Sequence, residues 1–249
     1  MTPSLVMLEP QDARAWAPFL GARPICELRA GVWRIRERWE AALGTGTTAI
    51  MGERAVGFHE LDEPRARPLG PVTGPAVVAR ADFAPSGERH LLPRDARRVT
   101  HGGETVAWVL REGETWDGPH EEGDAVEMPG LLLRGAFDLV TALERFLADD
   151  CADFAVADAD PIPDESVVLG DADLVRVFGA IVEPGVVFDV RGGAVVLERG
   201  AEVRHGTRLE GPCYVGAGTR VLGGYVRASI FGPRCNVRGE IAASVFTGF

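Results

Sequence analysis

The sequence predicts a two-part protein, with an α/β domain over residues 1–160 followed by stacked parallel β-structure over residues 166–249. The first part rests on strands interspersed with helices, and the second rests on a six-residue period. Five aliphatic residues fall six apart without interruption: Leu197, Val203, Leu209, Val215 and Val221. Each of the first four is followed, four positions later, by a small residue: Ala201, Thr207, Cys213 and Thr219.

This period fits neither an α-helix, which repeats every 3.6 residues, nor an ordinary strand, which repeats every 2. It is typical of hexapeptide repeats, in which short parallel strands stack in a prism with aliphatic side chains pointing inward. We expect four or five stacked coils, with Leu197, Leu209 and Val221 at equivalent inward positions. Proteins of this kind fall into a few functional classes, most of them acyl transferases.

Glycine pairs break the repeat at residues 191–193 and 223–224, where we expect loops or longer turns. The chain ends in SVFTGF, which is apolar and has no polar capping segment. An uncovered strand edge invites pairing with other chains. We therefore interpret the sequence as a fragment of a longer protein, or as a chain whose last coil is covered by an oligomer contact.

The first half contains short strands, two helices and an acidic hinge. The helices are expected at Arg34–Leu43, which is closed by Gly44, and at 136–148, with Phe137, Val140, Leu143 and Leu147 on one face. Strands are expected at Leu5–Leu8, Thr48–Met51, Pro75–Ala79, Arg98–Thr100 and Thr105–Arg111. Residues 155–166 are acidic and contain proline, which is typical of a linker between domains.

Net charge, apolar runs and cysteine spacing limit the partners and the location that we expect for this protein. The net charge of −11 argues against nucleic acid, and no apolar run is long enough to span a membrane. The N-terminus lacks the features of a secretion signal, and the four cysteines show no zinc or disulfide spacing, so we expect a cytoplasmic protein. All 26 basic residues are arginine, which excludes any mechanism that needs a lysine amine.

An arginine-rich segment is the candidate anion site. Arg23 precedes Pro24, which restrains the loop, and Arg29 comes two residues before Gly31, where the backbone can bend close to a ligand. We predict that Arg23 and Arg29, oriented by Glu27, bind a phosphate or nucleotide. Glu27 could instead approach Mg²⁺ through water. The alternative is structural, with both arginines paired to acids that fix the first helix.

His205 lies inside the repeats and is the candidate general base for an acceptor amine or hydroxyl. The competing interpretation is an exposed corner residue before Gly206. A single repeat histidine cannot supply a three-histidine zinc site, so carbonic anhydrase chemistry is disfavoured. No metal ligands are assigned.

Both ends of the chain resemble a known family. The motif residues at the N-terminal end are Pro18, Arg23, Pro24, Glu27, Leu28, Arg29, Gly31, Arg36, Glu37 and Trp39, after the strand VMLEP. Together with LEGPCYVGAG and GEIAASVFTGF, they resemble sugar nucleotidyltransferases related to the bifunctional N-acetylglucosamine-1-phosphate uridyltransferase. The resemblance implies a nucleotidyltransferase-like domain followed by a left-handed β-helix.

The resemblance also implies substrates and assembly: a sugar phosphate or nucleotide, Mg²⁺ with a nucleoside triphosphate, acetyl-CoA for the full-length protein, and a homotrimer. The sequence departs from the family in having no Gly-rich phosphate loop and no lysine, and Ala22 replaces the usual threonine. Further coils that would hold the acyltransferase histidine are absent. Two functions follow: a sugar-phosphate nucleotidyltransferase or acyltransferase-like protein, or a degenerate, non-catalytic relative that binds sugar nucleotides or mediates oligomerisation.

Overall fold

The computed structural model describes residues 3–11, 14–19, 22–54, 56, 65–87 and 89–248. The protein is mostly β with few helices. Contacts divide the chain into two compact units, Met1–Leu28 with Trp33–Phe137 and Arg29–Val32 with Asp138–Phe249. Within the described ranges, no helix is both long enough and apolar enough to cross a membrane.

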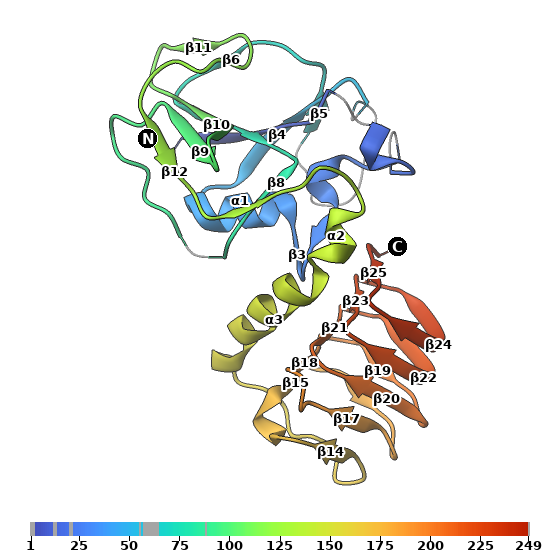
Figure 1. Ribbon diagram of the computed structural model, residues 1–249. Coiled ribbons are helices and arrows are strands. Elements are labelled where there is room, and N and C mark those ends of the chain that lie inside the picture. The colour runs from blue at the N-terminus through green and yellow to red at the C-terminus, as the bar shows by residue number, and fades with distance from the viewer. Residues whose placement is uncertain are drawn as a thin grey trace. The chain divides into compact units, whose positions relative to one another are not determined.

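The first unit is built on a mixed seven-stranded sheet (Figure 1). Its strands, from one edge to the other, are β12 (Ala125–Glu127), β9 (Arg98–His101), β10 (Glu104–Leu110), β7 (Ala76–Arg80), β1 (Ser4–Leu8), β4 (Thr47–Met51) and β5 (Arg65–Arg67). Strand β1 runs parallel to both β4 and β7, whereas β10 is antiparallel to β7 and β9. The five strands expected in this half are confirmed.

Strand β1 lies between β7 and β4 in the sheet and marks the point where the order of the strands reverses. The chain leaves β1 for β4 and β5 on one side, then returns through β7 and β10 on the other. Leu5 through Leu8 are all buried, as expected for a strand covered on both faces. Such a reversal of strand order is a topological switch point, and ligands bind at the carboxyl ends of strands there.

The first helix, α1 (Ile35–Leu43), forms where the sequence predicted it and packs against β8 (Phe83–Pro85). Trp39 is fully buried; its indole Nε1–H donates to the Arg80 carbonyl oxygen at 3.1 Å, and its ring lies 5.6 Å from that of Phe83. Gly44 ends the helix in the left-handed conformation, with φ of 65°. The smaller elements of this unit are η1 (Arg14–Trp16), η2 (Ile25–Glu27), β3 (Trp33–Arg34), β6 (Val72–Thr73), β11 (Thr115–Trp116) and β13 (Gly130–Leu132).

The second unit contains three ladders of short parallel strands, an arrangement compatible with a β-helix (Figure 1). One ladder holds β14 (Val167–Leu169), β17 (Val187–Asp189), β20 (Thr207–Glu210) and the later parts of β22 (Arg220–Arg227) and β24 (Asn236–Ala242). The next holds β15 (Val175–Val177), β18 (Val195–Leu197), β21 (Cys213–Val215), β23 (Ile230–Phe231) and β25 (Val245–Phe246). The third holds β16 (Ile181–Val182), β19 (Glu202–Val203) and the starts of β22 and β24.

The six-residue period correctly identified the inward side chains. All five aliphatic positions and all four small positions are at most 1% exposed, and most belong to one continuous apolar core. The expected equivalence within this set needs correction. Val215 pairs with Leu197, Val221 pairs with Val203, and Leu209 pairs with Val226, so Leu197, Leu209 and Val221 occupy three different ladders. Successive six-residue repeats therefore fall on the three ladders in turn, and the same ladder recurs after three repeats.

The predicted breaks in the repeat have physical causes. The pairing of β22 with β24 shifts register between Val221 and Gly224. At the earlier break, the backbone of residues 192–193 approaches Gly211 so closely that side chains cannot fit. A Cβ at Gly192 would lie 2.7 Å from the Gly211 carbonyl oxygen, and one at Gly211 would lie 2.0 Å from the Gly193 carbonyl oxygen. Glycine is therefore required at this turn.

The second predicted helix is wrong as a single helix. The chain forms α2 (Asp138–Thr141) and α3 (Leu143–Asp153), because Ala142 has φ of −90° and ψ of 0° and breaks the helical path. Leu143 and Leu147 are fully buried as expected, but Phe137 is 80% exposed and Val140 is 41% exposed. The predicted apolar face therefore ends at the break.

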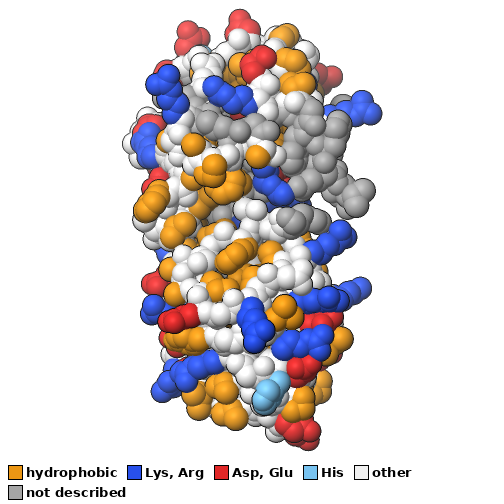
Figure 2. Space-filling model, turned by 90° about the vertical axis from the view of Figure 1, so that its right-hand side faces the viewer, with side chains coloured by type: hydrophobic (Ala, Val, Ile, Leu, Met, Phe, Trp, Pro, Cys, Tyr) orange, Lys and Arg blue, Asp and Glu red, His pale blue; other side chains and the backbone are white. Residues whose placement is uncertain are grey.

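The remaining elements of the second unit are β2 (Arg29–Ala30), η3 (Phe154–Val156) and η4 (Ala172–Leu174). In the acidic segment expected as a hinge, Asp160 accepts a hydrogen bond from the Gly179 N–H at 2.5 Å. Directly before this segment, the Phe154 carbonyl oxygen accepts a hydrogen bond from the Arg176 guanidinium at 3.2 Å. Figure 2 shows arginine and acidic side chains interspersed on the face drawn.

Candidate functional site

A pocket of about 790 Å³ opens at the switch point of the first unit's sheet. Residues 8–11 line it where β1 ends, Arg80 and Asp82 line it where β7 ends, and residues 103–105 line it where β10 begins. This size is typical of a site for a small molecule. The location is the one that parallel strands offer to ligands, because the chain leaves β1 toward one side of the sheet while β7 lies on its other side.

Tryptophans form the apolar wall of the pocket. Trp108 and Trp116 are 3% and 4% exposed, and their ring centroids lie 5.7 Å apart at 49°. The Trp108 indole N–H donates to the His120 carbonyl oxygen at 2.8 Å. The Trp116 Nε1–H is buried and has no hydrogen-bond partner among the described residues.

Among the lining residues that the structure describes, Arg80 is the basic one, and its charge is already engaged. Its guanidinium makes two parallel hydrogen bonds to the Asp82 carboxylate, each 2.8 Å long, and a third to the Thr105 carbonyl oxygen at 3.2 Å. The hydrogen bond from Asp82 is the main cause of a raised pKa of Arg80, although partial burial acts against it. Arg80 therefore holds Asp82 in place and remains a cation.

Two further carboxylates of the lining are paired with arginines. Glu104 forms an ion pair with Arg134, whose hydrogen bond lowers the pKa of Glu104. Glu121 accepts hydrogen bonds from the Arg98 guanidinium at 2.5 Å and from the Thr105 hydroxyl at 2.7 Å. These pairs fix the carboxylate oxygens around the pocket and leave them as hydrogen-bond acceptors.

Glu9 follows β1 directly and differs from the other acids of the pocket. Its carboxylate accepts hydrogen bonds from the Ile25 N–H at 2.8 Å and the Cys26 N–H at 3.2 Å. Burial of the carboxyl group raises the pKa of Glu9 to about 7, and the two backbone bonds only partly offset this effect. Glu9 can therefore exchange a proton near neutral pH.

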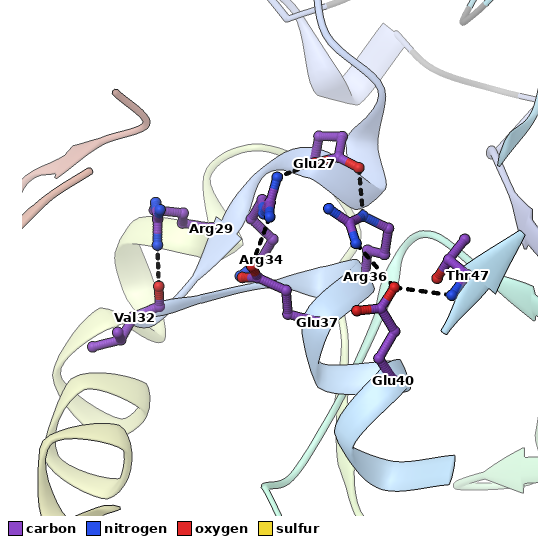
Figure 3. Close-up of polar contacts among 8 residues, drawn as sticks. All are labelled: Glu27, Arg29, Val32, Arg34, Arg36, Glu37, Glu40 and Thr47. Carbon is purple, nitrogen blue, oxygen red and sulfur yellow. Dashed lines mark hydrogen bonds and ion pairs between the residues drawn. The ribbon is translucent and has the colours of Figure 1, made fainter. Parts of the chain in front are cut away.

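Glu27, a predicted site residue, is buried in an arginine network (Figure 3). Its carboxylate accepts hydrogen bonds from Arg36 Nε at 2.6 Å and from Arg34 at 2.9 Å. Burial acts to lower the pKa of Arg36, but the Glu27 hydrogen bond and charge more than offset it, so the pKa is raised. Glu40 joins Arg36 to the Thr47 N–H, with distances of 2.9 and 3.0 Å. The network links η2, α1 and β4.

The two predicted arginines belong to different compact units. Arg23 lies in the first unit and is half-buried. Arg29 lies in the second unit, where its guanidinium donates to the Val32 carbonyl oxygen (Figure 3). In the same segment, the Val32 N–H donates to the buried Asp150 carboxylate at 2.7 Å. The arginines that Glu27 orients are thus Arg34 and Arg36, and the anion-binding role of Arg23 and Arg29 stays a prediction.

His205 is exposed at a turn between β19 and β20. Its ring Nδ1 lies 2.8 Å from the Pro184 carbonyl oxygen, and its backbone N–H donates to Glu183 at 2.8 Å. A carbonyl partner requires a proton on Nδ1, which leaves Nε2 as an acceptor. This tautomer is compatible with a general base, and the catalytic role remains a prediction. Among the described residues, no group of three His, Cys, Asp or Glu side chains could hold a metal ion.

The pocket residues Arg80, Asp82, Trp108 and Trp116 were not predicted as site residues. They come from three separate segments, which only the sheet brings together. The available signal was the acid that directly follows the first strand, Glu9. A chemically active group at the end of a buried parallel strand is a useful marker, because that end faces the ligand crevice.

The comparison with known families supports a sugar nucleotidyltransferase-like family. Residues 5–68 match a family described as sugar nucleotidyl transferase. The matching region includes β1, Glu9 and the Glu27 network, and its residues 8–11 line one side of the pocket. No curated protein matches the chain.

Proposed function

We propose that the protein is a sugar-phosphate nucleotidyltransferase or acyltransferase-like protein of nucleotide-sugar metabolism, and that its first unit binds the sugar-containing substrate in the pocket beside β1. The observation that carries the proposal is the position of this pocket. It lies at the switch point of the sheet, and one side of it belongs to the segment that matches the sugar nucleotidyl transferase family.

The proposal extends to the second unit and to cofactors. We assign its three ladders to a left-handed parallel β-helix of hexapeptide repeats over residues 166–249, on the support of the inward period and the parallel pairing. The proposed cofactors are Mg²⁺ with a nucleoside triphosphate, and acetyl-CoA for a full-length protein. We also propose a cytoplasmic homotrimer.

Calorimetry tests substrate binding. The chain is titrated with UTP, dTTP and sugar 1-phosphates in the presence of Mg²⁺. Nucleotidyl transfer joins a sugar-phosphate oxygen to the α-phosphorus of the triphosphate and releases pyrophosphate, so a pyrophosphate assay on the same mixtures detects turnover. Binding with pyrophosphate release supports the transferase. Absence of binding by all of these compounds would overturn the proposal.

The second candidate is a non-catalytic relative that binds sugar nucleotides or mediates oligomerisation. The absence of lysine and of a Gly-rich phosphate loop favours it, because these groups usually hold the triphosphate. In the same experiment, binding without pyrophosphate release would identify this function. Light scattering tests the oligomer, and a monodisperse monomer would contradict the homotrimer.

Arg23→Gln and Arg29→Gln, made separately, test the predicted phosphate contacts. If the side chains bind phosphate, each variant should weaken nucleotide or sugar-phosphate binding and change the melting temperature little. A loss of stability without a change in affinity would favour the structural alternative. His205→Gln tests the general base, because a base should be required for acyl transfer and dispensable for substrate binding.

A further inference from the structure

We infer that a cavity of about 370 Å³ in the second unit binds a small amino acid, a molecule that carries one carboxylate and one ammonium group. The carboxylate of the ligand contacts Arg227, and its ammonium group contacts Glu144. All residues that line the cavity belong to the second unit, so the site is separate from the pocket beside β1 and goes beyond the proposed function.

The cavity is formed by α3 and by the corners at which the chain passes from the first ladder to the second. Glu144 and Ala148 form its helix wall, because they lie four residues apart and share one face of α3. The other lining residues come from the turns of three successive coils, at residues 192, 210–212 and 227–228. Glycine, alanine and proline occupy most of the lining positions, and these short side chains leave room for a ligand. The volume lies within the range of small-molecule sites.

Arg227 supplies the positive charge of the cavity. It is the last residue of β22 and lies opposite Glu210 in the parallel pairing of β20 with β22. Its side chain is exposed and forms no ion pair with another residue that the structure describes. A guanidinium binds a carboxylate through two parallel hydrogen bonds. Arg227 is therefore available to the carboxylate of a ligand.

The two acids of the lining differ in the partners that they already have. Glu210 accepts a hydrogen bond from the Tyr225 hydroxyl, and its Oε2 lies 4.0 Å from the Arg208 Nη2. Glu144, in the first turn of α3, is exposed and has no ion-pair partner within the described part of the chain. An ammonium group supplies three donors, and ionised carboxylates accept them. Glu144 is therefore the available acid, and Glu210 offers a second acceptor.

This arrangement of charges favours a ligand that carries both signs. Arg227 and Glu144 line one cavity without forming an ion pair with each other, so each can pair with a ligand group of opposite charge. A simple anion would be attracted by Arg227 but repelled by two carboxylates, and a simple cation would be repelled by the guanidinium. A ligand with one carboxylate and one ammonium group pairs with both charges and adds no net charge.

A graded series of amino acids tests the inference: glycine, β-alanine, 4-aminobutyrate and 6-aminohexanoate. Each is compared with the carboxylic acid that lacks its ammonium group and with the amine that lacks its carboxylate. We expect titration calorimetry at neutral pH and low salt to show, for at least one member, about tenfold tighter binding than for both of its analogues. The length of that member then reports the separation of the two charges. If no member binds more tightly than both analogues, the inference is overturned.

Charge variants locate the binding. Arg227→Gln should reduce the affinity for the preferred amino acid to that of its amine, and Glu144→Gln should reduce it to that of its carboxylic acid. Both side chains are exposed, so both variants should melt like the parent. Arg238→Gln and Glu165→Gln are the matched controls, equal charge changes at exposed residues outside the lining, and should preserve the preference. Parent-like affinity in either cavity variant would overturn the inference.

A variant that fills the cavity supplies an independent test. Ala148→Trp places a large ring between the helix wall and the turns, and it should abolish binding of the preferred amino acid. Ala152→Trp, four residues further along α3, exposed and outside the lining, should leave binding unchanged. Binding that survives in Ala148→Trp would place the amino acid elsewhere on the protein and contradict the inference.

Discussion

The two units achieve stability in different ways. In the second unit, neighbouring coils repeat one contact, in which an inward aliphatic side chain stacks on its equivalent in the next coil, as Val203 does on Val221. In the first unit, single contacts join segments far apart in the sequence, such as the Trp39 indole and the Arg80 carbonyl oxygen. A repeated contact can be recognised from sequence spacing, whereas a single long-range contact cannot.

The ion pairs of the two units differ in how deeply they are buried. Glu27 is 1% exposed and lies between two arginines of the first unit, so its charge depends on those partners. In the second unit, Arg204 pairs with Glu183 and Glu202 on the outer surface, where water screens the charges. Substitutions of buried and of exposed charges should therefore have very different effects on the two units.

The largest effect is expected from a charge placed in the apolar core of the second unit's ladders. Val203→Asp, or Val215→Asp, buries a carboxylate without a partner, which costs several kcal/mol and should unfold the ladders. Circular dichroism during thermal melting measures the loss. Exposed Arg199→Asp is the control and should shift stability by less than about 0.5 kcal/mol. If the Val203→Asp variant melts at the same temperature as the parent, the assignment of inward positions in the repeat is wrong.

Glu27→Gln tests the buried network of the first unit. Removal of the carboxylate leaves Arg36 buried without its closest charge partner, and we expect a loss of about 3–5 kcal/mol. Urea denaturation measures it, with exposed Glu53→Gln as the matched control. If stability is unchanged and ligand binding is lost instead, Glu27 acts in the predicted anion site and not as a structural acid.

Glu9 should make the first unit sensitive to pH. Its pKa is about 7 in the folded protein and 4.5 when unperturbed, so the folded state binds this proton more tightly. The resulting stabilisation is complete below pH 4.5 and is lost as the pH rises through 7, by about 3 kcal/mol in total. Unfolding free energies of the parent and of Glu9→Gln are compared across this range. Parallel pH curves would contradict the prediction.

The smallest effect is expected from a polar bridge between coils. Buried Thr219 donates to the Gly232 carbonyl oxygen at 2.7 Å and accepts from the Cys235 N–H at 3.0 Å. Thr219→Val leaves both backbone groups without this partner and should cost about 1–3 kcal/mol. Thr219→Ser keeps the hydroxyl and should cost less. Equal losses in the two variants would show that packing, and not the hydrogen bonds, matters here.

The sequence predicted the repeat better than it predicted the candidate site. The inward positions of the ladders and the helix Ile35–Leu43 were recognised, because local periodicity and a glycine stop signal specify them. Helix 136–148 was predicted as one element, and the break at Ala142 was missed because helix formers continue across it. The predicted domain boundaries, residues 1–160 and 166–249, stay a prediction.

By itself, the sequence determined the inward face of each coil, the all-arginine basic set and the family resemblance of the N-terminal segment. Only the tertiary structure decided that Glu27 binds Arg34 and Arg36, and that Glu9, Arg80 and Trp116 line one pocket. The physical reason is sequence distance. A periodic contact is written in neighbouring residues, whereas a pocket at the end of a sheet forms only when β1, β7 and β10 come together.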